Sequence, residues 1–125
     1  MANDMLNKAE VDRLSVLFGS CSPLFIALGD EVRQKLILDL AEASVEDANG
    51  INVTNLSAKS HLSRPAISHH LKVLKDSGLV KPVKVGTQIF YRLNLEDSIG
   101  DLADLISSIQ RILPAIAPRP AMAVG

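Results

Sequence analysis

Apolar residues recur at intervals of three and four positions through the first third of the chain. From about Leu6 to Leu28 this spacing predicts a helix, in which Pro23 marks a kink or a break into two pieces. Asp30 then provides the N-cap of a second helix, which should run from Glu31 to about Glu42. Three charged side chains of that helix are expected in solvent: Arg33, Lys35 and Asp39.

Two further helical segments are expected in the middle of the chain, at about residues 54–60 and at residues 64–77. Ser63 is well placed to cap the second of them. Pro65 is tolerated in its first turn because the amides there have no intrahelical acceptor to lose. Gly78 should end it as a left-handed residue, so the pair has the form of a helix-turn-helix.

Two runs typical of strands follow, Leu79 to Val85 and Gln88 to Leu93, with Gly86-Thr87 between them. This pattern predicts a β-hairpin, and Pro82 places its first strand at a sheet edge. A short strand around residues 51–53 is also expected ahead of the helix-turn-helix.

A last helix, capped by Asn94 or Asp97, carries an apolar stripe at helical spacing as far as Leu113. The predicted order α-α-α-α-β-β-α is that of a winged helix-turn-helix, a mainly α fold with a small β-hairpin. We expect one domain over residues 1–113 and a disordered tail over residues 114–125, where three prolines end the helix.

The composition of the 125 residues, 47% hydrophobic and only 3% aromatic, favours packed helices over a β-sandwich. The single cysteine, Cys21, cannot form an internal disulfide, which fits a reducing, cytoplasmic compartment. The sequence shows no secretory leader pattern and no apolar run near the ~18 residues that span a bilayer, so no membrane association is expected.

Charge is sorted along the chain, although the net charge is only −1. Residues 61–92 contain six bases and one acid, a net charge of +5, whereas the remainder sums to −6. All three histidines also fall in this basic segment. A cationic segment that contains the second helix of the helix-turn-helix and the hairpin indicates contact with the phosphates of double-stranded DNA.

A helical wheel of residues 64–77, at about 100° per residue, separates an apolar face from a polar face. Ser68 and His69 lie on the polar face near the helix start and are the candidate base-reading residues. Four residues are candidate phosphate anchors, which position the helix without specifying a sequence: Ser63, Arg64, Lys72 and Lys75. Pro65 and five hairpin residues complete the predicted DNA-binding surface: Lys84, Gly86, Thr87, Gln88 and Arg92.

The run LSRPAISHHLKVLKDSGLV at residues 62–80 resembles the recognition-helix motif of the ArsR/SmtB family of bacterial repressors. Residues 27–33 (ALGDEVR) resemble the start of that family's second helix, and residues 86–93 (GTQIFYRL) resemble its wing. The resemblance implies a homodimeric repressor that binds an inverted-repeat operator and is released by an inducer.

Two-fold pairing is also expected from the sequence, because the first and last helices are the most apolar and a monomer would expose part of their surface. Such a dimer presents two recognition helices to successive major grooves, about 34 Å apart. The predicted interface residues come from both helices: Leu14, Leu17, Phe18, Cys21, Leu102, Leu105, Ile106 and Ile109.

No metal site and no cofactor are predicted, and the effector stays unidentified. Residues 51–55 lack the Cys-x-Cys pair of the family's arsenic and cadmium sites, and the last helix offers three Asp but no His for zinc. Cys21 is expected in the core, with redox sensing at this one thiol as the alternative.

Two other classes of function are open. A winged helix can serve as a protein–protein contact module, but a surface of that kind does not need a segment of net charge +5. An enzyme, such as an isolated methyltransferase dimerisation domain, is not expected, because the sequence has no Gly-rich cofactor loop and no nucleophile–base pair.

Overall fold

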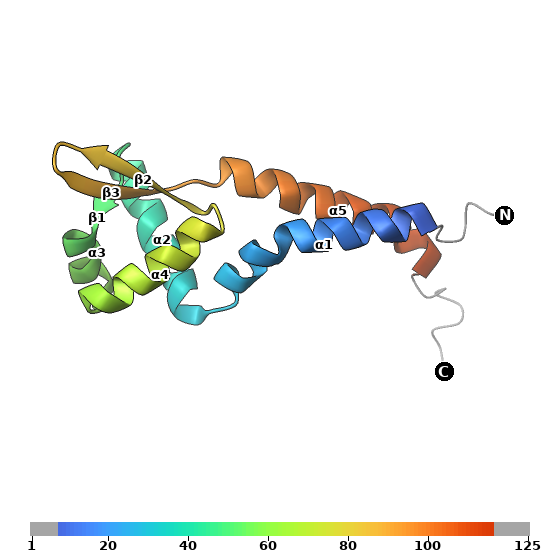
Figure 1. Ribbon diagram of the computed structural model, residues 1–125, viewed down its shortest axis with the longest axis horizontal. Helices are drawn as coiled ribbons and strands as arrows, with labels where there is room; N and C mark the ends of the chain where they lie inside the picture. The colour runs from blue at the N-terminus through green and yellow to red at the C-terminus, as the bar shows by residue number, and fades with distance from the viewer. Residues whose placement is uncertain (1–7, 117–125) are drawn as a thin grey trace. The chain divides into compact units, whose positions relative to one another are not determined.

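The structure, a computed structural model, describes residues 8–116. It is mainly helical with a small antiparallel sheet, in the element order of a winged helix-turn-helix (Figure 1). The predicted fold class is therefore confirmed. The elements are α1 (Lys8–Leu28), α2 (Glu31–Glu46), β1 (Ile51–Asn52), α3 (Val53–Ser60), α4 (Arg64–Asp76), β2 (Val80–Val85), β3 (Gln88–Leu93) and α5 (Glu96–Ile116).

The chain forms two compact units. The winged unit comprises Ser22–Ile99, and the helical-pair unit comprises, of the described residues, 8–21 and 100–116. The sequence predicts one domain over residues 1–113 and does not distinguish these units, because α1 and α5 each contribute residues to both.

Prolines do not interrupt the two long helices where the sequence suggests. α1 is continuous through Pro23, and α5 includes Pro114 and continues to Ile116. A single proline removes one backbone hydrogen bond, and the hydrogen bonds of the neighbouring turns keep the helix continuous despite this loss. The expected helix start at Leu6 and the expected disorder over residues 117–125 lie outside the described part of the chain.

Helices α2, α3 and α4 build the core of the winged unit from their apolar stripes. Each is capped by a polar side chain that accepts the backbone N–H of the residue three positions later. The capping residues are Asp30, Asn52 and Ser63 respectively. These side chains satisfy amides that have no acceptor within the helix. The largest fully buried apolar side chains come from all three helices: Leu36, Leu40, Leu56, Ile67 and Leu74.

The turn between α3 and α4 is made by His61, which ends α3 in the left-handed conformation at φ 58°. The hydroxyl of Ser57 donates a hydrogen bond to the carbonyl of Leu62 across this turn. Gly78 follows α4 at φ 82°, as predicted. These two left-handed residues fix the directions in which the chain enters and leaves α4.

The sheet has the strand order β1-β3-β2, and both strand pairs are antiparallel. β2 is an edge strand, which is the position predicted from Pro82. The hairpin register pairs Val80 with Leu93 and Val85 with Gln88, and Gly86 turns the chain at φ 62°. Figure 1 shows this sheet lying over α2, α3 and α4.

α2 continues past its predicted end to Glu46. The hydroxyl of Ser44 donates to the carbonyl of Leu40 at 2.7 Å and accepts the backbone N–H of Leu93 on β3 at 3.0 Å. The last turn of α2 is thus held by a strand 49 residues later in the chain, and no local pattern in α2 contains that contact.

Asp39 was expected in solvent, and this expectation is wrong, because its side chain is only 15% exposed. Its Oδ2 accepts from the hydroxyl of Ser60 at 2.7 Å and from Nζ of Lys35 at 3.2 Å. The Asp39 carboxylate therefore links α2 to the end of α3, the first helix of the helix-turn-helix.

In the helical-pair unit, α1 and α5 enclose a small apolar cluster. Leu17, Cys21 and Leu105 are buried, and three neighbours pack against them in partly buried positions: Leu14, Leu102 and Ile109. By length and composition alone α1 is apolar enough to cross a membrane. In the structure 22% of its most apolar stretch is buried, and the buried residues include Leu17 and Cys21, which pack within the chain.

Candidate nucleic-acid interface

Helix α4 presents the polar face that the helical wheel predicts. Ile67, Leu71 and Leu74 are buried on its inner side. Ser63, at the N-cap, accepts the backbone N–H of Ala66 at 3.3 Å, and Pro65 occupies the first turn. The predicted DNA-facing residues of this segment are all exposed: Ser63, Arg64, Pro65, Ser68, His69, Lys72 and Lys75.

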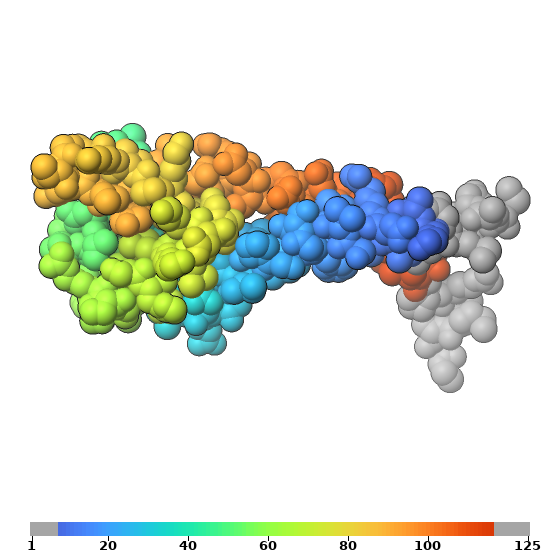
Figure 2. Space-filling model, in the orientation of Figure 1, coloured from blue at the N-terminus to red at the C-terminus, as the bar shows by residue number. Residues whose placement is uncertain are grey.

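The hairpin adds a second polar element beside α4. On the face seen in Figure 2 the surface of the β2–β3 hairpin (gold) adjoins that of α4 (yellow-green). Four of the predicted hairpin residues are exposed: Lys84, Gly86, Thr87 and Gln88. Arg92 differs, because it is half-buried opposite Lys81, and its Nε has no hydrogen-bond partner within residues 8–116.

Two hollows lie on this face, and sequence reasoning missed the residue that they share. A hollow of about 300 Å³ is lined by residues of α4 and by Tyr91 of β3. A second, of about 390 Å³, is lined by the start of α3, by Arg64, by the hairpin turn and again by Tyr91. Tyr91 therefore forms the floor between the recognition helix and the wing. Its position depends on the pairing of strand β3 with β1 and β2, in which Tyr91 lies opposite Ile51 and Pro82.

Asn52 is a second residue that the sequence reasoning missed. Its Oδ1 accepts the backbone N–H of Asn55 at 2.8 Å, which caps α3. Its Nδ2 donates to Oε1 of Gln88, the first residue of β3, at 3.2 Å. One amide side chain thus couples the start of the helix-turn-helix to a wing residue predicted to contact DNA.

One acid lies on the otherwise cationic face. Nζ of Lys72 is 3.1 Å from Oδ2 of Asp76, one turn later on α4, and both side chains are largely exposed, at 76% and 64%. An exposed pair of this kind contributes little stability. In the structure the pair holds the Lys72 ammonium beside Asp76, along the surface of the helix.

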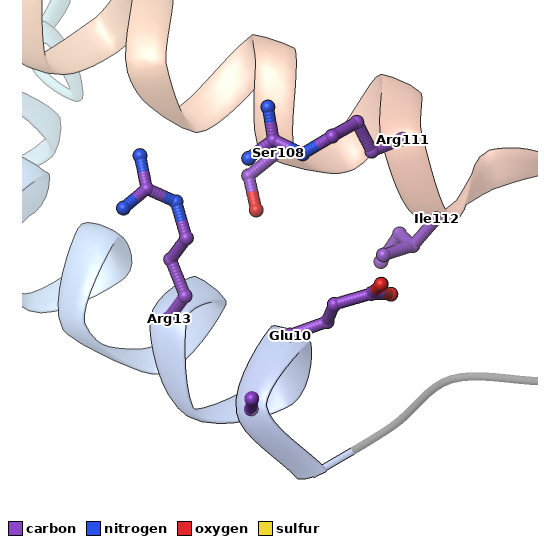
Figure 3. Close-up of a pocket in the computed structure, with 6 residues that line it drawn as sticks. Glu10, Arg13, Ser108, Arg111 and Ile112 are labelled. Atoms are coloured by element: carbon purple, nitrogen blue, oxygen red, sulfur yellow. The ribbon is translucent and has the colours of Figure 1, made fainter.

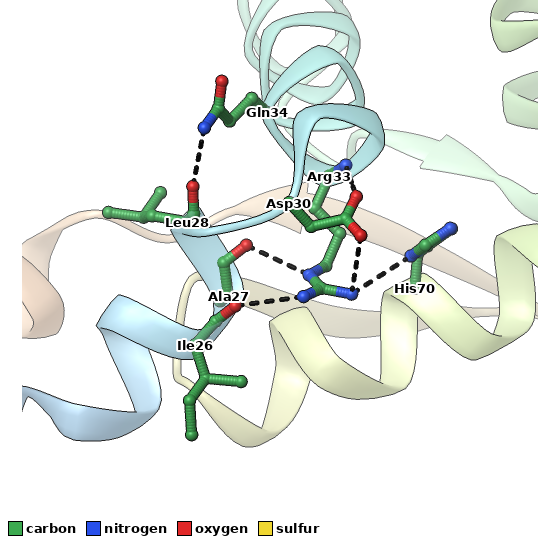
Figure 4. A network of polar contacts seen from close by, with 7 residues as sticks. All are labelled: Ile26, Ala27, Leu28, Asp30, Arg33, Gln34 and His70. Carbon is green, nitrogen blue, oxygen red and sulfur yellow. Dashed lines mark hydrogen bonds and ion pairs between the residues drawn. The ribbon is translucent and has the colours of Figure 1, made fainter.

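Behind this face, Arg33 of α2 makes a network that the sequence reasoning placed wrongly in solvent (Figure 4). Its side chain is only 12% exposed. Nε donates to the carbonyl of Ala27 and Nη2 to that of Ile26, each at 3.0 Å. Gln34 donates to the next carbonyl, that of Leu28, at 2.7 Å. These carbonyls end α1, where no intrahelical donor is available.

The same guanidinium reaches the recognition helix. Nη1 of Arg33 lies 3.8 Å from Oδ2 of Asp30 and 3.4 Å from Nδ1 of His70, on the inner side of α4. A guanidinium can only donate, so Nδ1 of His70 accepts and the imidazole is neutral. Burial lowers the pKa of His70, against the opposing effect of the Asp30 carboxylate. The hydrogen bond from the Arg33 amide lowers the pKa of Asp30.

Replacing Arg33 with alanine should therefore loosen α4 as well as the α1–α2 junction. The variant loses donors to two helix-end carbonyls, and we expect the free energy of unfolding to fall by about 2 kcal/mol. Arg33→Lys keeps the charge but lacks the planar fork, so it should recover less than half of the loss. Urea unfolding of the three proteins checks this, and equal stability of wild type and Arg33→Ala would contradict the network.

The predicted dimer residues fall into three groups in the structure. Leu17, Cys21 and Leu105 are buried within their own chain, whereas Phe18 and Ile106 are 46% and 48% exposed. Leu14, Leu102 and Ile109 are partly buried beside the cluster. Sequence periodicity places all eight on the apolar sides of two helices but does not separate the positions facing inward from those facing outward.

Cys21 is a core residue, as expected, with 1% of its surface exposed. Burial raises the pKa of its thiol, and the carboxylates of Asp101 and Asp104 raise it further. The thiol is therefore poorly suited to ionise. Within residues 8–116 no group of three His, Cys, Asp or Glu side chains is arranged to hold a metal ion.

Comparison with known proteins gives consistent matches. The family described as bacterial regulatory protein, arsR family, matches residues 30–81. The transcriptional repressor SdpR of Bacillus subtilis is 34% identical over 87 residues, covering 67% of this chain and 90% of the repressor. The arsenical resistance operon repressor of Escherichia coli is 37% identical over 71 residues, covering 57% and 56% respectively. The solved structure of an ArsR-like transcriptional regulator from Rhodococcus sp. RHA1 has a TM-score of 0.59 and 30% identity, covering 76% of this chain and 80% of that one.

Proposed function

The chain belongs to the arsR family of bacterial regulatory proteins and is a winged-helix, DNA-binding transcriptional regulator, and we propose that it acts as a homodimeric repressor in the cytoplasm. Each subunit would read one half of an inverted-repeat operator. An effector, not identified by any residue set described above, would release it.

The observation that carries the proposal is the union of α4 and the hairpin on one exposed, cationic face. Ser68 and His69 lie near the start of α4, where a helix in the major groove meets base edges. Lys72 and Lys75 follow along the same helix as phosphate contacts. Gly86 and Thr87, at the hairpin turn, are exposed and small enough to approach the backbone of the duplex.

The dimer part of the proposal is supported by apolar side chains that the helical-pair unit leaves exposed. α1 exposes Phe18 at 46% and Val16 at 68%, and α5 exposes Ile106 at 48% and Leu113 at 49%. A monomer gains nothing from keeping such residues in water. Burial of these side chains against a second copy would form the interface from the outward-facing positions of α1 and α5.

Duplexes selected from a random pool by the purified protein test the proposal. We expect selected sites to be inverted repeats, and their affinity should fall steeply with salt, because each phosphate contact releases counterions. The protein should elute as a dimer in size-exclusion chromatography. A protein that ignores duplexes at low ionic strength, or stays monomeric, would contradict the proposal and favour a protein–protein contact module.

The alternative, redox sensing at Cys21, predicts that an oxidant lowers the DNA affinity of the protein. The structure favours the opposite result. Because the thiol is buried and its pKa is raised, hydrogen peroxide should leave the DNA affinity of the wild type unchanged. Cys21→Ala should behave identically, with and without peroxide. Loss of affinity on oxidation of the wild type alone, measured by fluorescence anisotropy, would establish redox sensing instead.

A further inference from the structure

A pocket of about 210 Å³ lies within the helical-pair unit, between the first turns of α1 and the C-terminal half of α5 (Figure 3). Glu10 and Arg13 face it from α1, opposite Ser108, Arg111 and Ile112 of α5. None of these residues belongs to the nucleic-acid interface described above, so the pocket is a separate feature of the protein.

Two guanidinium groups give the pocket its charge. Neither Arg13 nor Arg111 has a hydrogen-bond or ion-pair partner among the residues that the structure describes. Lys8 and Asp12, nearby on α1, pair with each other at 3.5 Å and do not line the pocket. Glu10 is the single acidic residue of the lining, and it is not without an interaction partner. The lining therefore carries a net charge of +1.

The remaining wall residues narrow the chemistry of a ligand. Ser108 is buried, with 2% of its surface exposed, and it contributes a hydroxyl to the lining. Arg forks and a hydroxyl donor match the two oxygens of a carboxylate. Ile112 and Ala9 offer an apolar wall that a strongly hydrated inorganic anion would leave unused.

We propose that this pocket binds a small organic carboxylate, with its oxygens held by Arg13, Arg111 and the hydroxyl of Ser108 and its apolar part against Ile112. The volume corresponds to about seven waters, at ~30 Å³ each. Ligand pockets for drug-sized molecules start at about 300 Å³, so the ligand is smaller than these and near the size of benzoate.

Titration of the isotope-labelled, full-length protein with benzoate, followed by NMR, tests the assignment. Saturable shifts are expected at the amides around Arg13, Ser108 and Arg111, with a Kd of about 1 mM or tighter. Benzamide has the same shape without the charge and should bind at least about tenfold more weakly. Inorganic phosphate, which lacks the apolar body, should also bind more weakly than benzoate.

Variants separate this site from general attraction of anions to the protein. Arg13→Gln and Arg111→Gln change exposed side chains, so both should fold, and each should weaken benzoate binding by about tenfold. Ser108→Ala removes only the hydroxyl and should weaken it less. Lys8→Gln is the matched control and should leave it unchanged. Non-saturable binding, equal binding of benzamide, tighter binding of phosphate, or an equal effect of Lys8→Gln would each overturn the assignment.

Discussion

Replacing Gly50 with alanine should destabilise the winged unit by at least about 3 kcal/mol. Gly50 has φ 89°, a region that costs an L-residue about 1–2 kcal/mol. An added Cβ would lie 1.9 Å from the carbonyl oxygen of Tyr91 and 2.9 Å from Cα of Arg92, both in strand β3. Because backbone atoms cannot rotate away, β1 must separate from β3, which adds about 1–3 kcal/mol.

Gly86→Ala is the matched control for this change. Gly86 also has positive φ, at 62°, but an added Cβ there meets no atom within 4 Å. It should therefore show only the conformational cost, about 1–2 kcal/mol. Urea unfolding of both variants measures the difference. If Gly50→Ala cost no more than Gly86→Ala, the close approach of residue 50 to β3 would be wrong.

Features that depend on neighbouring residues were predictable from the sequence. The caps at Asp30 and Ser63 each involve an amide three residues ahead, and both are confirmed. The left-handed residues Gly78 and Gly86 also follow from local chemistry, because only a residue without Cβ adopts such angles freely. Helix-turn-helix and hairpin are built from such short-range signals, which explains why the element order was correct.

Features that depend on distant residues were not predictable. Arg33 looks like a solvent-facing residue on a helical wheel, yet it contacts His70, 37 residues later. Asp39 is similarly drawn inward by Ser60, which lies on another helix. A polar residue can be buried wherever a partner satisfies it, and periodicity carries no information about that partner.

The same distinction applies to the candidate interface. The exposed residues of α4 follow from its amphipathic pattern, since the buried positions Ile67, Leu71 and Leu74 fix the opposite face. The role of Tyr91 and the link from Asn52 to Gln88 require the pairing of β1 with β3. Supporting residues of a site are therefore found by structure, and its outward-facing residues by sequence.

The double substitution of His69 and Lys72 by alanine should reduce affinity for the selected operator by about a hundredfold or more. Loss of a base or phosphate contact costs about 1–3 kcal/mol, and a dimer loses each contact twice. Both side chains are exposed and neither fills the core, so the variant should remain folded and dimeric. Fluorescence anisotropy with the selected duplex, and chromatography of the free variant, measure the two quantities.

The single variants distinguish the two proposed roles. Lys72→Ala should weaken selected and scrambled duplexes alike and reduce the dependence of affinity on salt. His69→Ala should weaken the selected duplex more than the scrambled one, since base contacts alone carry sequence information. Lys35→Ala removes an equal charge from α2, where Lys35 pairs with Asp39, and should change neither affinity. If Lys35→Ala were as damaging as Lys72→Ala, net charge rather than the face of α4 would determine binding.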